Sequence, residues 1–390
     1  MTVTALDLSA FVADRLVARN AASRALFERE ADRLAQASEQ MADRFLRGGR
    51  LLAFGQGAAA TDAEHVSVEF VHPVIVGKRA LPALDLSAAF DRLLPALVRE
   101  SDIVMGFGDG EAISTALADA AARGAYTFAF NGGRGDFAIE APAADPFVAQ
   151  ELVEVLYHTL WETVHVFFEH RQHRHDDVGA SAFLYPFLGT ARQDTAGVIG
   201  EVSASIRSKA ADDERLRVDM ARDQAGHIAA VIDVVRRQLA AGATLVMFGN
   251  GGSATDANDW AIDCVSPPSG AAAIRALSLS MEPASITAIA NDVGSYAIFL
   301  RQLIAHGRQG DVAIAISTSG GSANIIAALA EARKRGLMTV ALLGYDGGEI
   351  VRRSLADLPI VVPCEYIPRI QEVQASIYHI MTEAWRRWHL

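Results

Sequence analysis

The sequence predicts a doubly wound α/β fold that is built twice. Short apolar segments alternate with longer segments of helical periodicity, for example TLVMFG (244–249), VAIAIS (312–317) and TVALLG (339–344). This alternation is typical of a parallel sheet covered by helices on both faces. Two segments, RLLAFGQGAAATDA (50–63) and TLVMFGNGGSATDA (244–257), align without a gap. We therefore expect two copies of one domain, each large enough to bury its own core.

The repeat continues beyond these two loops. The dipeptide before IVMGFGDG ends in Asp102, and the dipeptide before VAIAISTSG ends in Asp311. The segment QELVEVLYHTLWE (150–162) matches QEVQASIYHIMTE (371–383), with Gln, Glu, Tyr-His and Glu at identical places. The first half lacks the counterpart of residues 285–299, which we interpret as the loss of a loop and not of a core strand.

A break in periodicity separates the two copies. Residues 170–193 follow no regular pattern and contain Gly and Pro. The predicted domains are therefore residues 1–169 and 196–390, joined by a linker over residues 170–195. A histidine-rich tract begins at the end of the first domain and could hold a metal, but a solvated linker is the favoured interpretation. This tract comprises His165, His170, His173 and His175, with Asp176 and Asp177.

Composition argues against several classes of function. The net charge is −12, whereas a nucleic-acid-binding protein needs a basic face. Any anionic ligand must therefore be held by local donors. The two cysteines, Cys264 and Cys364, are far apart and fit a reducing compartment. No signal peptide and no membrane-length apolar run is recognised. We expect a soluble, cytoplasmic protein without nucleic-acid or membrane partners.

Two loops of the second half have the composition of a phosphate site. Gly249-Asn250-Gly251-Gly252-Ser253 follows a predicted strand and precedes a helix, so that main-chain amides and a hydroxyl can approach an anion. Ser317-Thr318-Ser319-Gly320-Gly321-Ser322 has the same setting after another strand. Either loop alone could be a simple helix cap. Two such loops at the carboxyl ends of strands in one sheet favour phosphate binding.

In combination these motifs resemble a known family. The GNGGSxxDA loop, TAIAND (287–292), ISTSGxS (316–322) and RIQE…H (369–379) are similar to those of the phosphoheptose isomerase family, within the sugar isomerase (SIS) domain superfamily. The first half resembles the same domain with degraded loops. The resemblance implies a fold of two tandem flavodoxin-like SIS domains, each a parallel sheet flanked by helices. It implies aldose–ketose isomerisation of a sugar phosphate, in particular sedoheptulose 7-phosphate, commonly with zinc.

The resemblance also assigns site residues and an assembly. By it, the sugar phosphate would be bound by Asn250, Gly251, Ser253, Asn291, Asp292, Ser317, Thr318, Ser319, Ser322 and Gln371. Because family members are tetramers of single domains, a homodimer of this chain would give the same four-domain assembly. The superfamily also contains regulators, so a non-catalytic phosphosugar-binding or protein-interaction role is the alternative function.

The family's His and Glu, four residues apart after the first loop, are divided between the halves. The first half has His65 and Glu69 at these positions, on one face of the predicted helix, whereas the second half has Asp259 and Asp263. The first half has also lost the loop hydroxyls, and Asp109 would repel a phosphate there. We therefore predict one composite site per chain, with His65 and Glu69 from the first half and the phosphate loops from the second.

The predicted chemistry follows from this site. Glu69 would move a proton between C1 and C2 of the sugar through an enediolate, and His379 would be the second catalytic residue. Zinc would be held by His65, Glu69, Gln371 and His379 and would polarise the carbonyl. Glu69 cannot easily serve as ligand and base at the same moment. Gln371 and His379, about 12 Å apart along a regular helix, can share one metal only if Gln371 precedes the helix or the ligands come from different subunits.

Some residues have plainer interpretations. Gln150 and His158, the first-half counterparts of Gln371 and His379, would be core or interface remnants. Asp259 and Asp263 could be a carboxylate pair with modified chemistry, but a solvated helix face is the plainer interpretation. The segment GQGAAA (55–60) fits a dinucleotide-binding fingerprint, which the matching repeat explains better as a decayed sugar-phosphate loop.

Overall fold

The computed structural model describes residues 5–73, 78–172, 195–267 and 271–388. The chain forms two compact units, which we call the N-terminal unit (residues 21–212) and the C-terminal unit (residues 1–20 and 213–390). Most of the predicted linker, residues 173–194, lies outside the described residues, as do His173 and His175.

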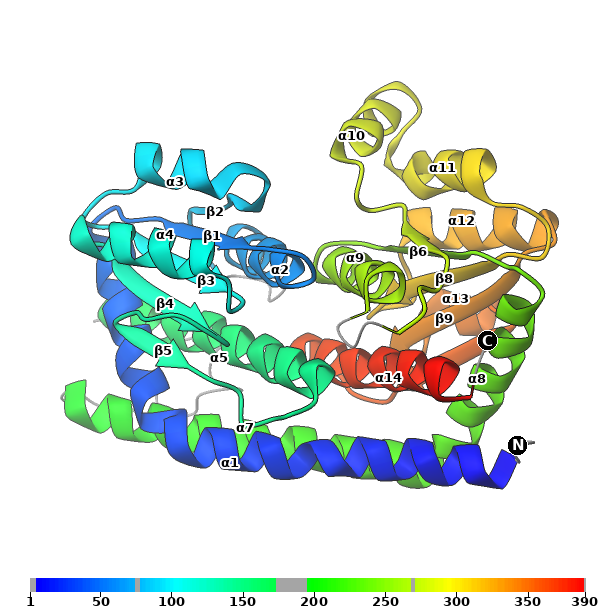
Figure 1. Cartoon of the computed structure of the whole chain (residues 1–390), viewed down its shortest axis with the longest axis horizontal. Helices are drawn as coiled ribbons and strands as arrows, with labels where there is room; N and C mark the ends of the chain where they lie inside the picture. The colour runs from blue at the N-terminus through cyan, green and yellow to red at the C-terminus, as the bar shows by residue number, and fades with distance from the viewer. Residues whose placement is uncertain (1–4, 74–77, 173–194, 268–270, 389–390) are drawn as a thin grey trace. The chain divides into compact units, whose positions relative to one another are not determined.

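The N-terminal unit contains a five-stranded parallel sheet flanked by helices (Figure 1). The strand order is β2-β1-β3-β4-β5, and all neighbouring pairs are parallel. The strands are β1 (Leu51–Gly55), β2 (Ala83–Asp85), β3 (Ile103–Phe107), β4 (Tyr126–Phe130) and β5 (Phe137–Ile139). The helices are α2 (Ala59–Val71), η1 (Ser87–Ala89), α3 (Phe90–Leu97), α4 (Glu111–Ala122) and α5 (Pro146–Gln172).

The C-terminal unit repeats this sheet. Its order, β7-β6-β8-β9-β10, is the N-terminal order shifted along the chain, and it is the 2-1-3-4-5 order of flavodoxin-like folds. The strands are β6 (Leu245–Gly249), β7 (Ala276–Ser278), β8 (Val312–Ser317), β9 (Met338–Gly344) and β10 (Leu358–Val362). The helices are α8 (Ala225–Ala240), α9 (Gly252–Val265), α10 (Pro283–Asp292), η3 (Ser295–Ala297), α11 (Ile298–His306), α12 (Ala323–Lys334), α13 (Gly348–Arg352) and α14 (Ile367–Arg387). The predicted fold class is confirmed.

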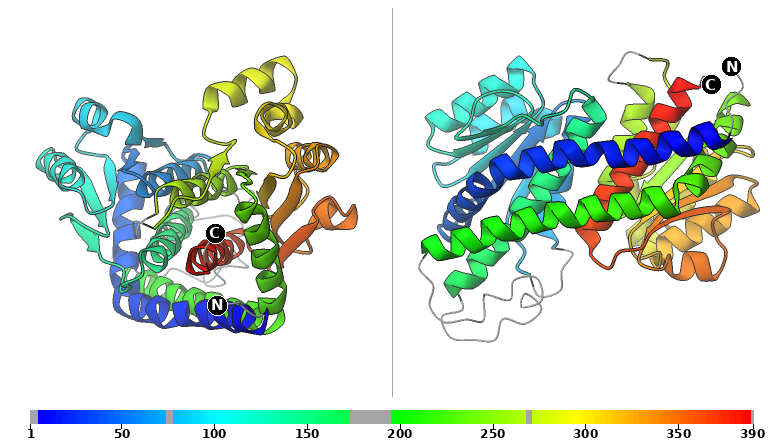
Figure 2. Two further views of the ribbon diagram at one scale, coloured as in Figure 1. Left: turned by 45° about the vertical axis from the view of Figure 1, so that its right-hand side comes forward. Right: turned by 90° about the horizontal axis from the view of Figure 1, so that it is seen from below.

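Two long helices are each divided between the units. Helix α1 (Ala5–Leu46) gives its residues up to Asn20 to the C-terminal unit, and α7 (Thr195–Asp223) gives its residues up to Asp212 to the N-terminal unit. Figure 2 shows both as continuous helices. The predicted domain ranges stay a prediction, but the contact-defined units differ from them by this exchange of helical segments.

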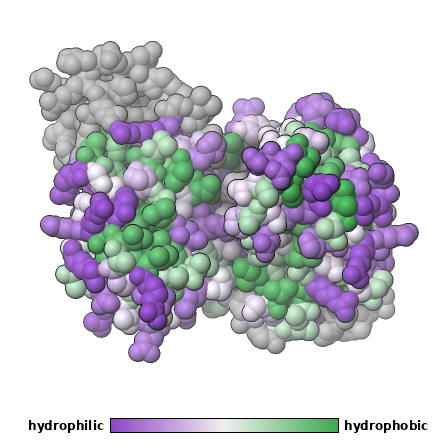
Figure 3. Space-filling view, turned by 90° about the horizontal axis from the view of Figure 1, so that it is seen from above, coloured by the Kyte–Doolittle hydropathy of each residue, from purple (hydrophilic) through white to green (hydrophobic). Residues whose placement is uncertain are grey.

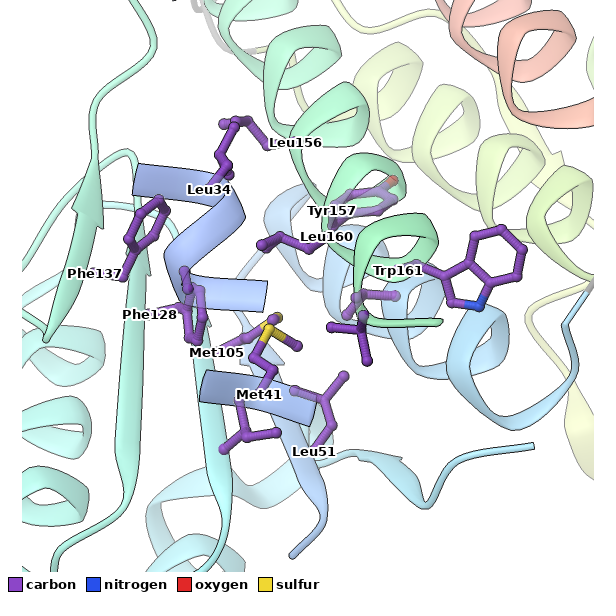
Figure 4. Packing of buried hydrophobic residues seen from close by; sticks show 14 of the residues in the cluster. Leu34, Met41, Leu51, Met105, Phe128, Phe137, Leu156, Tyr157, Leu160 and Trp161 are labelled. Carbon is purple, nitrogen blue, oxygen red and sulfur yellow. The ribbon is translucent and has the colours of Figure 1, made fainter. Parts of the chain in front are cut away.

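Strand residues alternate between two apolar layers. In β1, Leu51 and Ala53 pack in the layer that holds α2 and α5, whereas Leu52 and Phe54 pack in the layer that holds α3 and α4. The first layer includes Leu34 and Met41 of α1, which lie against the sheet beside Leu156 and Leu160 of α5 (Figure 4). A strand buried on both faces explains why these segments are continuously apolar in the sequence.

Buried aspartates fix equivalent points of the two sheets. Asp102 accepts hydrogen bonds from the main-chain N–H groups of Arg50 (3.0 Å) and Arg99 (2.9 Å) just before β3. Asp311 accepts the same bonds, from Thr244 (2.8 Å) and Arg308 (2.9 Å), just before β8. The matched aspartates noted in the sequence therefore do the same structural work, because each satisfies amides that the sheet leaves unpaired.

Two expectations about local structure are wrong. The stretch 285–299, interpreted as a loop, contains most of α10, η3 and the start of α11, because its apolar residues follow a helical pattern. His165, grouped with the solvated tract, is buried in α5, and its ring nitrogens lie 2.8 Å from the Trp161 carbonyl and 3.0 Å from the Arg79 carbonyl. Both sheets nevertheless keep five strands, so that no core strand is lost.

The outer surface of the N-terminal unit has an apolar groove of about 430 Å³ between α3 and α4. Its lining includes Phe90, Leu94, Pro95 and Ala116. Apolar side chains gather on this face in Figure 3. Among the described residues, no helix is long and apolar enough to cross a membrane.

Candidate functional site

The first phosphate loop of the C-terminal unit is shaped by its glycines. Gly251, immediately before α9, has φ 56° and ψ −128°, a conformation that favours glycine. A Cβ on Gly249 would lie 2.1 Å from the main-chain oxygen of Ser253, so the chain turns too tightly for a side chain there. The loop therefore brings the first amides of α9 to the carboxyl end of β6, as anion binding requires.

An amide pair involving this loop was not predicted. The side chains of Asn250 and Asn324 exchange two hydrogen bonds, of 3.0 Å and 2.7 Å. Asn324 is the second residue of α12, directly after the serine-rich loop. The pair thus joins the two predicted phosphate loops. The position of an amide residue next to the serine loop was the available sequence signal.

The second loop lies beside the first because their strands are neighbours. Gly249 of β6 is paired with Ile316 of β8, one residue before Ser317. The N–H of Gly320 donates to Ser317 Oγ (3.2 Å), and the N–H of Gly321 donates to Ser319 Oγ (3.3 Å). Ser322 precedes α12, and its side chain makes no capping hydrogen bond. Hydroxyls and amides therefore gather at the carboxyl ends of the two neighbouring strands.

The remaining predicted binding residues of α10 lie at its exposed end. Asn291 donates a hydrogen bond of 2.8 Å to Asp292, and both side chains are exposed. Among the described residues of the N-terminal unit their helix has no counterpart, because η1 and α3 are the helices found between β2 and β3 there.

The equivalent loop of the N-terminal unit keeps the shape but not the polar groups. A Cβ on Gly55 would lie 2.2 Å from the main-chain oxygen of Ala59, as at Gly249. Ala58 and Ala59 offer no hydroxyl. Asp109 and Glu111 are exposed after β3, where the other unit has serines and a threonine. The loop has therefore lost its anion-binding chemistry without losing its backbone.

The N-terminal unit has a buried His–Glu–His cluster. His65 and Glu69 lie on the same face of α2, with Nε2 and Oε1 3.8 Å apart, as the spacing predicted. His158 of α5 brings its Nε2 to 3.3 Å from Nε2 of His65. All three side chains are buried. Interpreting His158 as a core or interface remnant missed this convergence, although its place in the repeat was the signal for it.

Zinc fits this donor set. Two ligand nitrogens on one tetrahedral zinc, each at about 2.0–2.1 Å, lie about 3.3–3.4 Å apart, which is the separation seen here. His65, His158 and Glu69 supply two imidazoles and one carboxylate within 4.8 Å of one another. This matches the three-ligand set of many catalytic zinc sites.

The C-terminal unit has a cluster at the same place with different donors. Nε2 of His379 lies 3.5 Å from Oδ2 of Asp259 and 3.3 Å from Oδ2 of Asp263, and the Tyr378 hydroxyl donates to Asp259 (2.8 Å). Burial, reinforced by Asp259, raises the pKa of Asp263 to about 6. The interpretation of Asp259 and Asp263 as a solvated helix face is wrong, because α14 covers both.

Gln371 is also buried on α14, nearer to the start of the helix than His379. It lies inside the helix, eight residues before His379, so that the two are about 12 Å apart along the axis. This separation leaves the shared metal ion of the sequence analysis as a prediction. Beside it, Arg369 pairs with Glu372 and, at 3.8 Å, with Asp213, in a buried charge network that also includes Arg217.

Known proteins share both the fold and the motifs. The sequence profile of the SIS domain family matches residues 18–108 and 211–344, more than half of the chain. At the level of fold, the chain resembles the tagatose-6-phosphate ketose/aldose isomerase from Escherichia coli, with a TM-score of 0.53, 13% identity and coverage of 99% of this chain and 95% of that one. The two parallel sheets with their strand-end loops thus define a protein of the sugar isomerase domain class.

Sequence relatives narrow this class. The phosphoheptose isomerase of Geobacter sulfurreducens (strain ATCC 51573 / DSM 12127 / PCA) is 40% identical over 187 residues, covering 48% of this chain and 96% of the relative. That of Geobacter sp. (strain M21) is 39% identical over 191 residues, covering 49% of this chain and 96% of the relative. The chain belongs to the SIS domain superfamily and, within it, to the phosphoheptose isomerase family.

Proposed function

We propose that this chain interconverts the aldose and ketose forms of a sugar phosphate, with sedoheptulose 7-phosphate as the substrate to test first. The observation that carries the proposal is the pair of neighbouring loops after β6 and β8, whose amides and hydroxyls lie together at the carboxyl ends of these strands. The overall charge is −12, so a phosphate must be held by such local donors. Relatives named phosphoheptose isomerase support the choice of substrate.

The chemical step needs a base and an acid near C1 and C2. We assign proton transfer to Glu69, which would take a proton from one carbon and return it to the other through an enediolate, and we assign His379 to the oxygen atoms. Because Glu69 would serve as the base, zinc would have to be held during this step by the two histidines of the cluster, His65 and His158, and would supply polarisation of the carbonyl and stabilisation of the enediolate oxygen. The loops fix the phosphate end, so that binding energy orients the reacting carbons.

Catalytic and binding groups would come from both halves of the sequence. The composite assignment rests on how the motifs are distributed. The family's His–Glu pair occurs in the first half, as His65 and Glu69, and the hydroxyl-rich loops occur in the second half. Because Gln371 lies inside α14, about 12 Å along the axis from His379, we propose that one zinc ion would take both as ligands, together with His65 and Glu69, only if the ligands came from different subunits.

Substitution of Glu69 tests the proposed base. Glu69→Gln keeps the shape and removes the basic oxygen, so kcat should fall at least about 100-fold with little change in KM. Asp233→Asn, a surface substitution on α8, is the control and should keep wild-type kinetics. The assay follows sedoheptulose 7-phosphate beside a panel of hexose and pentose phosphates. Wild-type turnover by Glu69→Gln would remove Glu69 from its role, and no turnover of any sugar by the wild type would favour a non-catalytic binding protein.

Substitution of Ser319 tests the loop. Ser319→Ala removes one hydroxyl from the proposed phosphate site, and a lost hydrogen bond to a charged group costs about 1.5–3 kcal/mol. We expect KM to rise at least about tenfold. Ser354→Ala, outside both loops, serves as its matched control. An unchanged KM in Ser319→Ala would place the phosphate elsewhere.

The shape of this loop can be tested through Gly320. It has φ +58°, and a Cβ there would lie 2.2 Å from the main-chain oxygen of Gly347. Gly320→Ala should therefore displace the loop, lowering kcat/KM at least about tenfold while the thermal midpoint falls by a few degrees. Gly321→Ala, where a Cβ would have no neighbour closer than 3.8 Å, should keep near-wild-type kinetics.

We also propose that two chains form a homodimer in the reducing cytoplasm, giving four SIS domains. The resemblance to four-domain family assemblies supports the homodimer. The two free cysteines support a reducing compartment. Light scattering should then give a mass of twice 41.6 kDa. A mass of 41.6 kDa at micromolar concentration would reject the dimer.

A further inference from the structure

We propose that Asn324 is a positioning residue for ligand binding in the C-terminal unit, and that it acts through the side-chain amide of Asn250. The proposal rests on the proposed function, because it takes the loops after β6 and β8 to bind a sugar phosphate. Nδ2 of Asn250 donates to Oδ1 of Asn324 (3.0 Å), and Nδ2 of Asn324 donates to Oδ1 of Asn250 (2.7 Å). The first loop thus has its amide side chain held by the helix that follows the second loop.

The orientation of the Asn324 amide is fixed by its own helix. Its Oδ1 also accepts a hydrogen bond from the main-chain N–H of Ile325 (3.0 Å), in the first turn of α12. This end of the side chain must therefore be the oxygen, and the other end must donate to Asn250. Because a primary amide has two N–H groups, Asn250 keeps one of them for a ligand while it gives the other to Asn324. Asn324 thereby determines which atom of Asn250 serves as the donor.

The N-terminal unit builds the same turn without this pair. Gln56 stands at the position of Asn250 in the gap-free alignment, and the residue after it is a glycine of positive φ in both units, 62° and 56°. Ala112, the second residue of α4, stands at the position of Asn324, the second residue of α12. An alanine has no amide to offer. The turn therefore does not need the pair, which occurs in the unit whose loops keep their hydroxyls.

The location of the pair also separates positioning from a structural role. Asn250 is exposed and Asn324 is half-buried, so that water can replace the hydrogen bonds of either amide when the pair is broken. Asn324→Ala gives α12 the residue that α4 has at this place. We therefore expect this substitution to lower the thermal midpoint by less than about 3 °C.

Binding of sedoheptulose 7-phosphate to the full-length chain tests the proposal. Equilibrium dialysis is suitable, because it counts bound ligand whether or not the ligand is isomerised. We expect affinity to fall at least about tenfold in Asn250→Ala and at least about fivefold in Asn324→Ala. In the double variant, Asn324→Ala should add less than about twofold to the effect of Asn250→Ala, because it acts through that residue. Gln309→Ala removes an exposed amide at the opposite end of β8 and should bind as the wild type does.

Contrary outcomes distinguish this proposal from the proposed function. Wild-type affinity in Asn324→Ala, additive effects in the double variant, or a thermal midpoint lowered by much more than about 3 °C would each overturn the positioning role alone. Wild-type protein that binds the ligand but does not isomerise it would count against the proposed function alone. Absence of binding of sedoheptulose 7-phosphate and of every sugar in the panel would overturn both. If Asn324→Ala fails to fold by circular dichroism, Asn324→Ser is measured in the same way and decides.

Discussion

Val12→Asp is expected to unfold the C-terminal unit, although Val12 lies more than two hundred residues before its first strand. Val12 is fully buried, together with Leu8 and Leu16, in the core that holds α8 and α14. Phe11 adds an edge contact of 4.8 Å with Trp388. An aspartate at position 12 would place a carboxylate in this apolar layer, and we expect a loss of more than about 4 kcal/mol of unfolding free energy.

Val17→Asp is the matched control for this substitution. It places the same side chain on the same helix, but Val17 is 45% exposed. We expect a change of less than about 0.5 kcal/mol. Urea unfolding followed by tryptophan fluorescence is a suitable measurement, because Trp260, Trp385 and Trp388 all belong to the C-terminal unit. Equal stability of the two variants would show that residues 5–20 do not complete this core.

The exchange of helical segments explains what the sequence could predict about the fold. The strands were predictable because each is a short apolar run between turn residues, a local signal. By contrast, the cores against which α1 packs could not be predicted from the sequence. Its apolar spacing is compatible with a helix that packs on either unit, and only tertiary contacts assign Val12 to one core and Leu34 to the other. Local periodicity contains no information about which distant core a helix completes.

In the candidate site, too, the features set by local sequence were predictable and those set by tertiary contacts were not. The glycine and serine loops were predictable because positive φ angles and helix-end amides demand these residue types. The i, i+4 spacing also placed His65 and Glu69 together correctly. By contrast, Asp263 was misinterpreted because aspartates on an amphipathic helix are usually exposed. Its burial depends on α14, more than a hundred residues later in the chain.

Asp213 shows how a buried acid makes stability depend on pH. It is fully buried, and burial together with the nearby Glu372 carboxylate raises its pKa to about 8. In the unfolded chain the same group titrates near 3.8. Between these values the folded state holds a proton that the unfolded state has released. The contribution of protonated Asp213 to the free energy of unfolding is therefore fully present below about pH 4 and is lost as the pH rises toward 8.

Asp213→Asn should remove this dependence, since an amide resembles the protonated acid and does not titrate. We expect the wild-type unfolding free energy, relative to that of the variant, to fall by about 1.4 kcal/mol per pH unit between pH 5 and pH 8. Asp219→Asn, on the exposed side of the same helix, should follow the wild type throughout. Urea unfolding at pH 5, 6, 7 and 8 measures all three proteins. Parallel wild-type and Asp213→Asn curves would mean that Arg217 and Arg369, which lie 3.7 Å and 3.8 Å from its carboxylate, keep Asp213 ionised in the folded state.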